Sequence, residues 1–259
     1  MGIVLSYPKM GRSWLRFQLA NYLCQIYSLP VEVDFQTVYS IVPNDETEVH
    51  GRGRSGLLPE VHGNQFPVIA MRHQLVTPVA MTRSTMTQSF VLLLRSPFDT
   101  IVSHWHHARY HYASAVGTIS EFIRDEHTGI ANIVKYCENY AQSARMGHVR
   151  IVTYERMNER PAYELEGVIR HFGLPMDGSA IHYAVERSSF ENMQALEIAR
   201  GMKGIEYDRG NPAALRVRQG MVGNFRSYLA PDDIDFITTK FEASHAAIAL
   251  YRLAELEVI

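Results

Sequence analysis

The feature that most constrains the fold of this sequence is a short apolar run that leads through a polar loop into a helix-like segment. Residues 3–6 read Ile-Val-Leu-Ser, the loop that follows contains Pro8 and Gly11, and residues 14–29 carry apolar side chains at helical spacing. An apolar strand followed by a turn and an amphipathic helix is the start of a βαβ unit. The sequence therefore predicts an α/β fold built on a parallel sheet.

Three further apolar runs are predicted to be strands, at residues 68–71, 90–94 and 149–153. The run at 90–94 is continuously apolar, as a central parallel strand is. Helices are expected from Pro97 onward and over residues 119–146, 154–172 and 232–256, with loops at 42–63 and 200–215. Since no repeat or linker divides the chain, we expect residues 1–259 to form a single domain, with a short central parallel sheet flanked by helices.

Composition argues against several classes of protein. The 259 residues are 46% hydrophobic and 20% charged, as in ordinary globular proteins. The formal net charge of -2 provides no basic field that would recruit nucleic acid or an acidic membrane. No apolar stretch approaches the ~20 residues of a membrane span, and no signal peptide precedes the first strand. The expected location is the cytoplasm, where Cys24 and Cys137 would be buried free thiols.

The loop between the first strand and helix is predicted to bind an anion. Backbone N–H groups and the positive end of a helix dipole meet at such a loop. Lys9 and Arg12 add two cations and Ser13 adds a hydroxyl donor. The phosphate loop of NTPases, G-x-x-x-x-G-K-[ST], nearly fits if Gly11 is its second glycine. However, Ser6 then stands where the first glycine should be, and Arg12 stands where the lysine should be.

The residue after the third predicted strand separates this chain from a phosphate-loop NTPase. Such an enzyme ends a later apolar strand with an Asp that holds Mg²⁺, whereas the run at 90–94 is followed by Arg95. A cation there repels a metal and attracts a phosphate. A sulfuryl group in transfer carries less negative charge than a phosphoryl group, so cationic side chains and backbone donors can replace Mg²⁺. We expect an anionic ligand held without a metal.

These residues resemble the sulfotransferases that use 3′-phosphoadenosine 5′-phosphosulfate (PAPS), an α/β family with a nucleotide-binding core like that of P-loop NTPases. The family's first loop reads Y-P-K-S-G-T-T-W, which residues 7–14 match except at Met10, Arg12 and Ser13. Its second motif places an Arg and, eight residues later, a Ser, as Arg95 and Ser103 are placed. Its late loop, R-K-G-x-x-G-D-W, is met by residues 218–225, with Gln219 in place of the Lys. Residues 184–193 and the Gly11-Arg12-Ser13 sequence of the first loop look similar to bacterial members of the family.

The resemblance implies that PAPS is the co-substrate, that adenosine 3′,5′-bisphosphate (PAP) is a product, and that no metal takes part. Lys9 would also be catalytic, because its charge would stabilise the leaving phosphate oxygen. The positions that the resemblance assigns to nucleotide binding are Lys9, Met10, Gly11, Arg12, Ser13, Trp14, Arg95, Ser103, Tyr154, Ser188, Phe190, Arg218, Gln219 and Gly220.

The resemblance also implies a general base at His73, because the family uses a His just after the strand that precedes the 3′-phosphate strand. The alternative is a loop histidine that only makes local hydrogen bonds, since the Lys that the family often has two positions earlier is Met71 here. A second group of histidines could bridge a metal at helical spacing. No Cys, Asp or Glu accompanies them, so we assign no metal and expect them to face the acceptor cleft in part: His104, His106, His107 and His111.

The acceptor is the least constrained part of the prediction. The resemblance implies transfer to a hydroxyl or amine of a small molecule or glycan, and the likeness to bacterial members favours a carbohydrate, a glycoconjugate or a natural product. A small phenol or alcohol is the alternative acceptor. Two other classes stay open, a small-molecule kinase of the phosphate-loop type and a protein that binds PAP without turnover.

Overall fold

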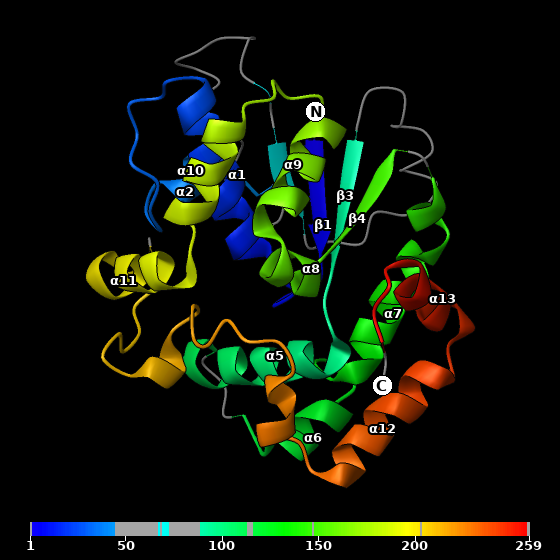
Figure 1. The fold of residues 1–259 in the computed structure, drawn as a ribbon. Coiled ribbons are helices and arrows are strands. Elements are labelled where there is room, and N and C mark those ends of the chain that lie inside the picture. Colours follow the sequence, from blue (N-terminus) through cyan, green and yellow to red (C-terminus); the bar gives the residue numbers. More distant parts are fainter. Residues whose placement is uncertain are drawn as a thin grey trace.

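Four parallel strands form the centre of the fold (Figure 1). The computed structural model describes residues 2–44, 67, 69–72, 89–112, 116–146, 148–202 and 204–257. The strands β1 (Gly2–Ser6), β2 (Ile69–Arg72), β3 (Ser89–Leu94) and β4 (Val149–Thr153) are ordered β2-β1-β3-β4. In their register Val4 pairs with Met71 on one side and with Val91 on the other. The predicted strands and the α/β fold class are confirmed.

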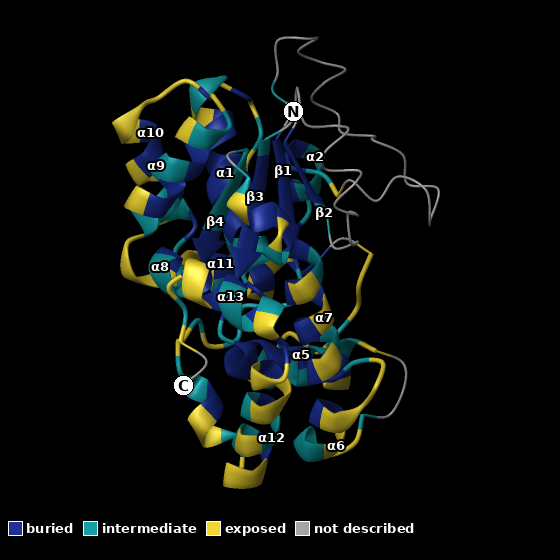
Figure 2. Ribbon diagram, turned by 90° about the vertical axis from the view of Figure 1, so that its right-hand side faces the viewer, coloured by how far each residue is buried: buried dark blue, intermediate teal, exposed yellow. Residues whose placement is uncertain are grey.

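The two central strands are buried along nearly their whole length (Figure 2). This burial accounts for the continuous apolar runs in β1 and β3, because a parallel strand in the middle of a sheet has both of its faces covered. All strands run in the same direction, so the carboxyl ends of β1 and β3 meet at one edge of the sheet. The residues that follow these two strands are therefore brought together.

The helices lie beside the sheet and below the edge at which its strands end (Figure 1). Over one face of the sheet lie α1 (Arg12–Ile26), α9 (Pro161–His171) and α10 (Gly178–Arg187), as Figures 1 and 2 show. Below the carboxyl ends of the strands runs α5 (Pro97–His111). The other α-helices within the described residues are α2 (Val38–Ile41), α6 (Ile119–Arg124), α7 (Ile130–Ala141), α8 (Tyr154–Glu159), α11 (Phe190–Arg200), α12 (Pro231–Glu242) and α13 (His245–Leu253).

Residues 119–146, predicted to be helical, form two α-helices, α6 and α7, with a break between them. Helix α6 ends at Arg124, where the carboxylate of Asp125 accepts hydrogen bonds from the backbone N–H groups of His127 and Thr128, at 2.9 and 2.7 Å. The chain then turns so tightly that a Cβ on Gly129 would meet the Ile123 carbonyl oxygen at 2.4 Å. The local hydrogen bonds of the Asp side chain compete with the helix and end it.

The two other long helices predicted from the sequence are also divided. Pro161 begins α9 after the short helix α8, because proline has no N–H to continue the helical hydrogen bonds. Ser244 separates α12 from α13 and caps α13 by accepting a hydrogen bond from the N–H of Ala247. Helices α10 and α11 were not predicted; their N-caps are Asp177 and Ser189.

The predicted state of the cysteines is confirmed, since Cys24 and Cys137 are both free and buried. Within the described residues, none of the helices has both the length and the apolar character that a membrane span requires.

Candidate active site

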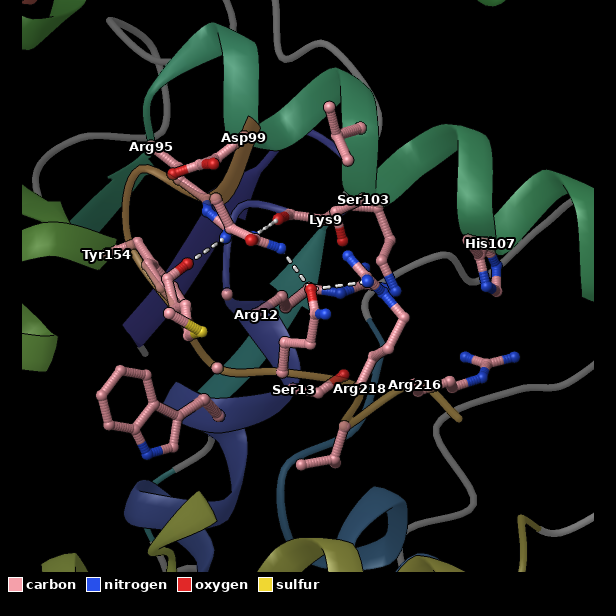
Figure 3. A pocket seen from close by; sticks show the side chains of 18 of the residues that line it. Lys9, Arg12, Ser13, Arg95, Asp99, Ser103, His107, Tyr154, Arg216 and Arg218 are labelled. Carbon is pink, nitrogen blue, oxygen red and sulfur yellow. Dashed lines mark hydrogen bonds between the residues drawn. The ribbon is translucent and has the colours of Figure 1, made fainter. Parts of the chain in front are cut away.

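A cavity of about 360 Å³ opens where β1 and β3 end (Figure 3). Its walls come from the loop between β1 and α1, from one face of α5, from α8 and α11, and from the irregular segment 216–224. The residues that line it are Pro8, Lys9, Gly11, Arg12, Ser13, Trp14, Arg95, Asp99, Val102, Ser103, His107, Tyr112, Tyr154, Asn158, Phe190, Met193, Arg216, Val217, Arg218, Gln219, Gly220, Met221 and Asn224.

The first loop of the cavity has an unusual backbone. Lys9 has φ 71°, in the left-handed region that L residues seldom adopt, and Gly11 has φ 100°. A Cβ on Gly11 would meet Cδ2 of Tyr154 at 2.7 Å, so the close approach of the loop to that ring requires glycine. Helix α1 begins directly afterwards, at Arg12. The loop thereby directs the amino end of a 15-residue helix at the cavity, as an anion site requires.

Arg95 connects three segments of the site. It follows β3, and its guanidinium donates hydrogen bonds to the carbonyls of Lys9 and Met221, both at 3.2 Å. The guanidinium carbon lies 4.0 Å from the centre of the Tyr154 ring, in a cation–π contact. Arg95 is only 9% exposed, and its Nε has no hydrogen-bond partner among the described residues. A buried cation with an unused donor can bind an anion.

One face of α5 lines the cavity at intervals of four residues, with Asp99, Ser103 and His107 one turn apart. The carboxylate of Asp99 is already engaged. It accepts hydrogen bonds from the backbone N–H groups of Gly223, at 2.7 Å, and Phe225, at 3.0 Å. Asp99 therefore attaches the segment 216–224 to α5 and leaves the Ser103 hydroxyl as the next polar group on the cavity side of the helix.

The late loop is held from several sides. Gly220 has φ 64°, and a Cβ there would meet Cδ2 of Phe190 at 2.6 Å. The Gly220 carbonyl accepts a hydrogen bond from Nδ2 of Asn158 at 3.1 Å. Arg218 donates to Oε1 of Gln219, at 2.6 Å, and to the hydroxyl of Tyr228, at 2.9 Å. These contacts fix the Arg218 guanidinium at the cavity, where a phosphate could bind it.

The electrostatic character of the cavity is basic. The pKa of Lys9 is lowered from 10.5 to about 7. Burial is the largest cause, and the neighbouring cations Arg216 and Arg95 contribute to the same shift. Burial also lowers the pKa of His107 to about 2, with Lys9 and Arg216 contributing. The pKa values of His104 and His106 are lowered to about 4, and burial is again the largest cause. An anionic ligand would relieve this repulsion among positive charges.

The structure brings together most of the residues predicted for the nucleotide. Two do not line the cavity. The side chain of Met10 is fully buried in the hydrophobic core. Ser188 is also fully buried; its carbonyl accepts from Nε1 of Trp14 at 2.9 Å, and its hydroxyl from Asn21 at 3.1 Å. His73 lies outside the described residues, so its role as general base stays a prediction.

The polar residues of the cavity that sequence reasoning missed include Asp99, Asn158 and Arg216. The first two could have been found, because each lies four residues from a predicted site residue on the same helix, Ser103 or Tyr154. Arg216 had no such signal, since the segment around it has no regular periodicity. Of the four histidines, His107 lines the cavity, whereas His104 is buried beside Tyr7 and Tyr112.

The described residues contain no group of three or more His, Cys, Asp or Glu side chains suited to hold a metal ion. Asp99, the one carboxylate among the residues that line the cavity, has both oxygens occupied by backbone N–H groups. The described part of the cavity thus offers donors to an anion rather than ligands to a cation.

Comparison with known proteins places the chain in a family. Residues 3–249 match the model of the sulfotransferase domain, so the chain belongs to that family. Cytosolic sulfotransferase 14 of Arabidopsis thaliana is 22% identical over 97% of this chain and 77% of its own length. The family assignment confirms the class of enzyme predicted from the sequence, a sulfotransferase.

Solved structures share the fold. Mouse sulfotransferase SULT7A1, solved in complex with PAP, matches with a TM-score of 0.62 at 19% identity, over 98% of this chain and 88% of the mouse chain. Retinol dehydratase, solved with androsterone and PAP, matches with a TM-score of 0.68 at 17% identity, over 99% and 82%. A sulfotransferase from Alicyclobacillus acidocaldarius matches with a TM-score of 0.53 at 13% identity, over 99% and 96%.

Proposed function

We propose that this chain transfers the sulfuryl group of PAPS to a hydroxyl or amine of an acceptor and releases PAP. The observation that carries the proposal is the position of Arg95. It stands at the end of β3, where a phosphate-loop NTPase has its metal-binding Asp, and reaches both the first and the late loop. Membership of the sulfotransferase domain family supports the same reading.

The described residues fit a nucleotide with phosphates at two positions. The 5′-phosphosulfate would bind at the first loop, between Lys9, Ser13 and the amino end of α1. The 3′-phosphate would bind Arg95, Ser103 and Arg218, which come from three different segments. The unused Nε of Arg95 supports this fit, because a buried guanidinium donor without a partner is costly. Trp14, Tyr154 and Phe190 offer aromatic faces for the adenine.

PAPS would supply the sulfuryl group. Side chains of this protein would position it, stabilise the negative charge that develops and accept the acceptor proton. Lys9 would stabilise the negative charge that develops on the leaving phosphate oxygen, since its ammonium lies in a partly enclosed, basic cavity. His73 would accept the proton of the acceptor hydroxyl as its oxygen forms the bond to sulfur. This role for His73 rests on the family resemblance of the sequence around it.

A carbohydrate, glycoconjugate or natural product is the acceptor that we propose, with a small phenol as the alternative. Trp105 and Tyr112 supply aromatic rings on and just after α5, and Tyr112 lines the cavity and is 45% exposed. Rings of this kind stack on sugars and on phenols alike.

The cytoplasmic location and a single domain over residues 1–259 remain part of the proposal. The name of the Arabidopsis relative is consistent with that location.

The first prediction concerns the ligand. PAP should raise the melting temperature of the protein in the presence of EDTA, because a ligand that binds only the folded state stabilises it by mass action. The measurement is a thermal-shift series with PAP, with ATP and Mg²⁺, and with adenosine as the uncharged control. A larger shift with ATP and Mg²⁺, or loss of the PAP shift in EDTA, would indicate a kinase instead.

The second prediction concerns the lowered pKa of Lys9, about 7 in the free protein. An anion beside Lys9 favours its ammonium form, so PAP binding above pH 7 should take up a proton. The affinity for PAP should then fall as the pH rises from 7 to 9, by up to about tenfold per pH unit. Calorimetric titration in two buffers of different ionisation enthalpy measures the uptake.

A substitution of Lys9 tests how far this residue accounts for the proton uptake and the pH dependence of PAP binding. Lys9→Met should abolish the proton uptake and the pH dependence, and it should lower turnover with PAPS more than PAP affinity at pH 7. Lys240→Met is the matched control, because Lys240 is an exposed lysine on α12. An affinity that stays constant from pH 7 to 9, with no proton uptake by the wild type, would contradict the prediction.

The third prediction concerns the general base. His73→Ala should cut turnover by about 10²–10⁴, the usual contribution of a positioned base, and leave PAP binding nearly intact. Wild-type turnover should decline on the acid side of about pH 6.5, where an ordinary imidazole becomes protonated. Near-normal turnover of His73→Ala, together with a large loss on changing His104, His106, His107 or His111, would move the base to α5.

A further inference from the structure

Arg216 is a cation of the cavity that none of the sulfotransferase motifs accounts for. It precedes the Arg218-Gln219-Gly220 motif by two residues and lines the same cavity. Figure 3 shows Arg216 and His107 toward one end of the cavity, with Arg95, Asp99 and Tyr154 toward the other. Of the residues proposed above for the 3′-phosphate, Arg95 lies at that other end, and Ser103 and Arg218 lie between it and Arg216 (Figure 3). Arg216 is not among the residues proposed for that phosphate, so it is available for a different anion.

The backbone of Arg216 is held in place by a buried carboxylate on α11. Glu197 is fully buried, and its oxygens accept hydrogen bonds from the N–H groups of Arg216 and Val217, both at 2.8 Å. The same carboxylate accepts a hydrogen bond from the hydroxyl of Tyr207 at 2.6 Å. Glu197 is therefore occupied by three donors, and the segment that carries Arg216 is fixed before any ligand binds.

The guanidinium of Arg216 has no counterion in the part of the chain that the structure describes. No ion pair of Arg216 is found there, and its Nε is buried without a hydrogen-bond partner. A buried guanidinium donor left without a partner is unfavourable. Arg216 contributes to lowering the pKa of both Lys9 and His107, which places its charge close to both. An anion at this end of the cavity would satisfy it.

The imidazole and phenol side chains at this end of the cavity can donate hydrogen bonds and, unlike Lys9, add no charge of their own. The ring of His107 lies 4.6 Å from that of His111 and 5.5 Å from that of Tyr112, between ring centres. Burial and the nearby cations lower the pKa values of both histidines, so both are neutral near pH 7. His111 donates from Nε2 to the Ala214 carbonyl at 2.8 Å, which ties α5 to the same irregular segment.

The positions of Ser103 and His107 along α5 indicate which end of the cavity would receive the acceptor. Ser103 and His107 are four residues apart, which is about 6 Å along a helix axis. If Ser103 marks the donor phosphate and Lys9 the leaving oxygen, as proposed above, the cavity beyond them at His107 is where the group to be sulfated enters. The Arg216 guanidinium then faces the acceptor.

We propose that Arg216, with His107 beside it, binds an anionic group of the acceptor, so that the chain sulfates a substrate that already carries a carboxylate or a sulfate ester. A guanidinium presents paired N–H donors that match the two oxygens of such a group. A uronic acid residue or a sulfated sugar has this chemistry. The inference rests on the proposed function, because it takes the donor to lie at the Arg95 end.

The test compares matched acceptors on the PAP-saturated protein. One set is methyl glucoside, methyl glucuronide and methyl glucoside 6-sulfate; a second pair is 4-hydroxyphenylacetamide and 4-hydroxyphenylacetate. Binding is measured by calorimetry or by saturation-transfer NMR, and turnover with PAPS is measured separately. In the wild type, at least one anionic member should bind about tenfold or more tightly than its neutral partner. Preference for the glucuronide or for the 6-sulfate tells a carboxylate from a sulfate ester.

Arg216→Gln should remove this preference and leave PAP affinity within about twofold. Arg218→Gln should instead weaken PAP binding, and Arg252→Gln, which changes an exposed arginine on α13, should change neither. The inference is overturned if no anionic member is preferred, if Arg216→Gln keeps the preference, or if it weakens PAP as strongly as Arg218→Gln does. Those results leave the proposed function standing. A wild type that fails to bind PAP would refute the proposed function, and the inference with it.

Discussion

The site depends on one buried guanidinium, that of Arg95. It reaches the Lys9 carbonyl in the first loop and the Met221 carbonyl in the late loop, and it lies against the ring of Tyr154. Its own carbonyl accepts a hydrogen bond from the Tyr251 hydroxyl at 2.7 Å, which ties it to α13. Segments far apart in the sequence are thus joined through a single cation, and a phosphate bound there would complete the set of contacts.

The same arrangement explains why the cavity suits an anion with several charges. Cations from three segments face it, and repulsion among them, added to burial, lowers the pKa of Lys9. The carboxylates nearby are used to hold backbone: Asp99 binds two N–H groups of the late loop, and Glu197 binds those of Arg216 and Val217. The carboxylates of Asp99 and Glu197 thus hold the backbone of the late segment in place, whereas the cationic side chains that line the cavity can bind anionic ligands.

Much of the fold, and of the set of residues that line the candidate site, could be predicted from the sequence, because both follow local patterns. Apolar runs placed the strands, and the residues just after β1 and β3 must meet at one edge of a parallel sheet. The helix boundaries were harder to predict, since Asp125 and Ser244 end or begin helices through local hydrogen bonds of their side chains. Met10 was assigned to the ligand because it lies within the loop that resembles the family's first motif, yet its side chain packs into the core. Arg216 could not be found, because its place depends on the tertiary contact with Glu197.

The role of Arg95 is tested most directly by measuring the affinity of PAP, in EDTA, for the wild type and for Arg95→Met and Arg95→Lys. Removing one partner of a buried charge-assisted pair costs about 2–5 kcal/mol, so Arg95→Met should weaken PAP binding by about 30-fold or more. Arg95→Lys should recover part of the loss, since it restores the charge without the paired donors. Circular dichroism would confirm that each variant is folded. A folded Arg95→Met protein that binds PAP as tightly as the wild type would contradict the account.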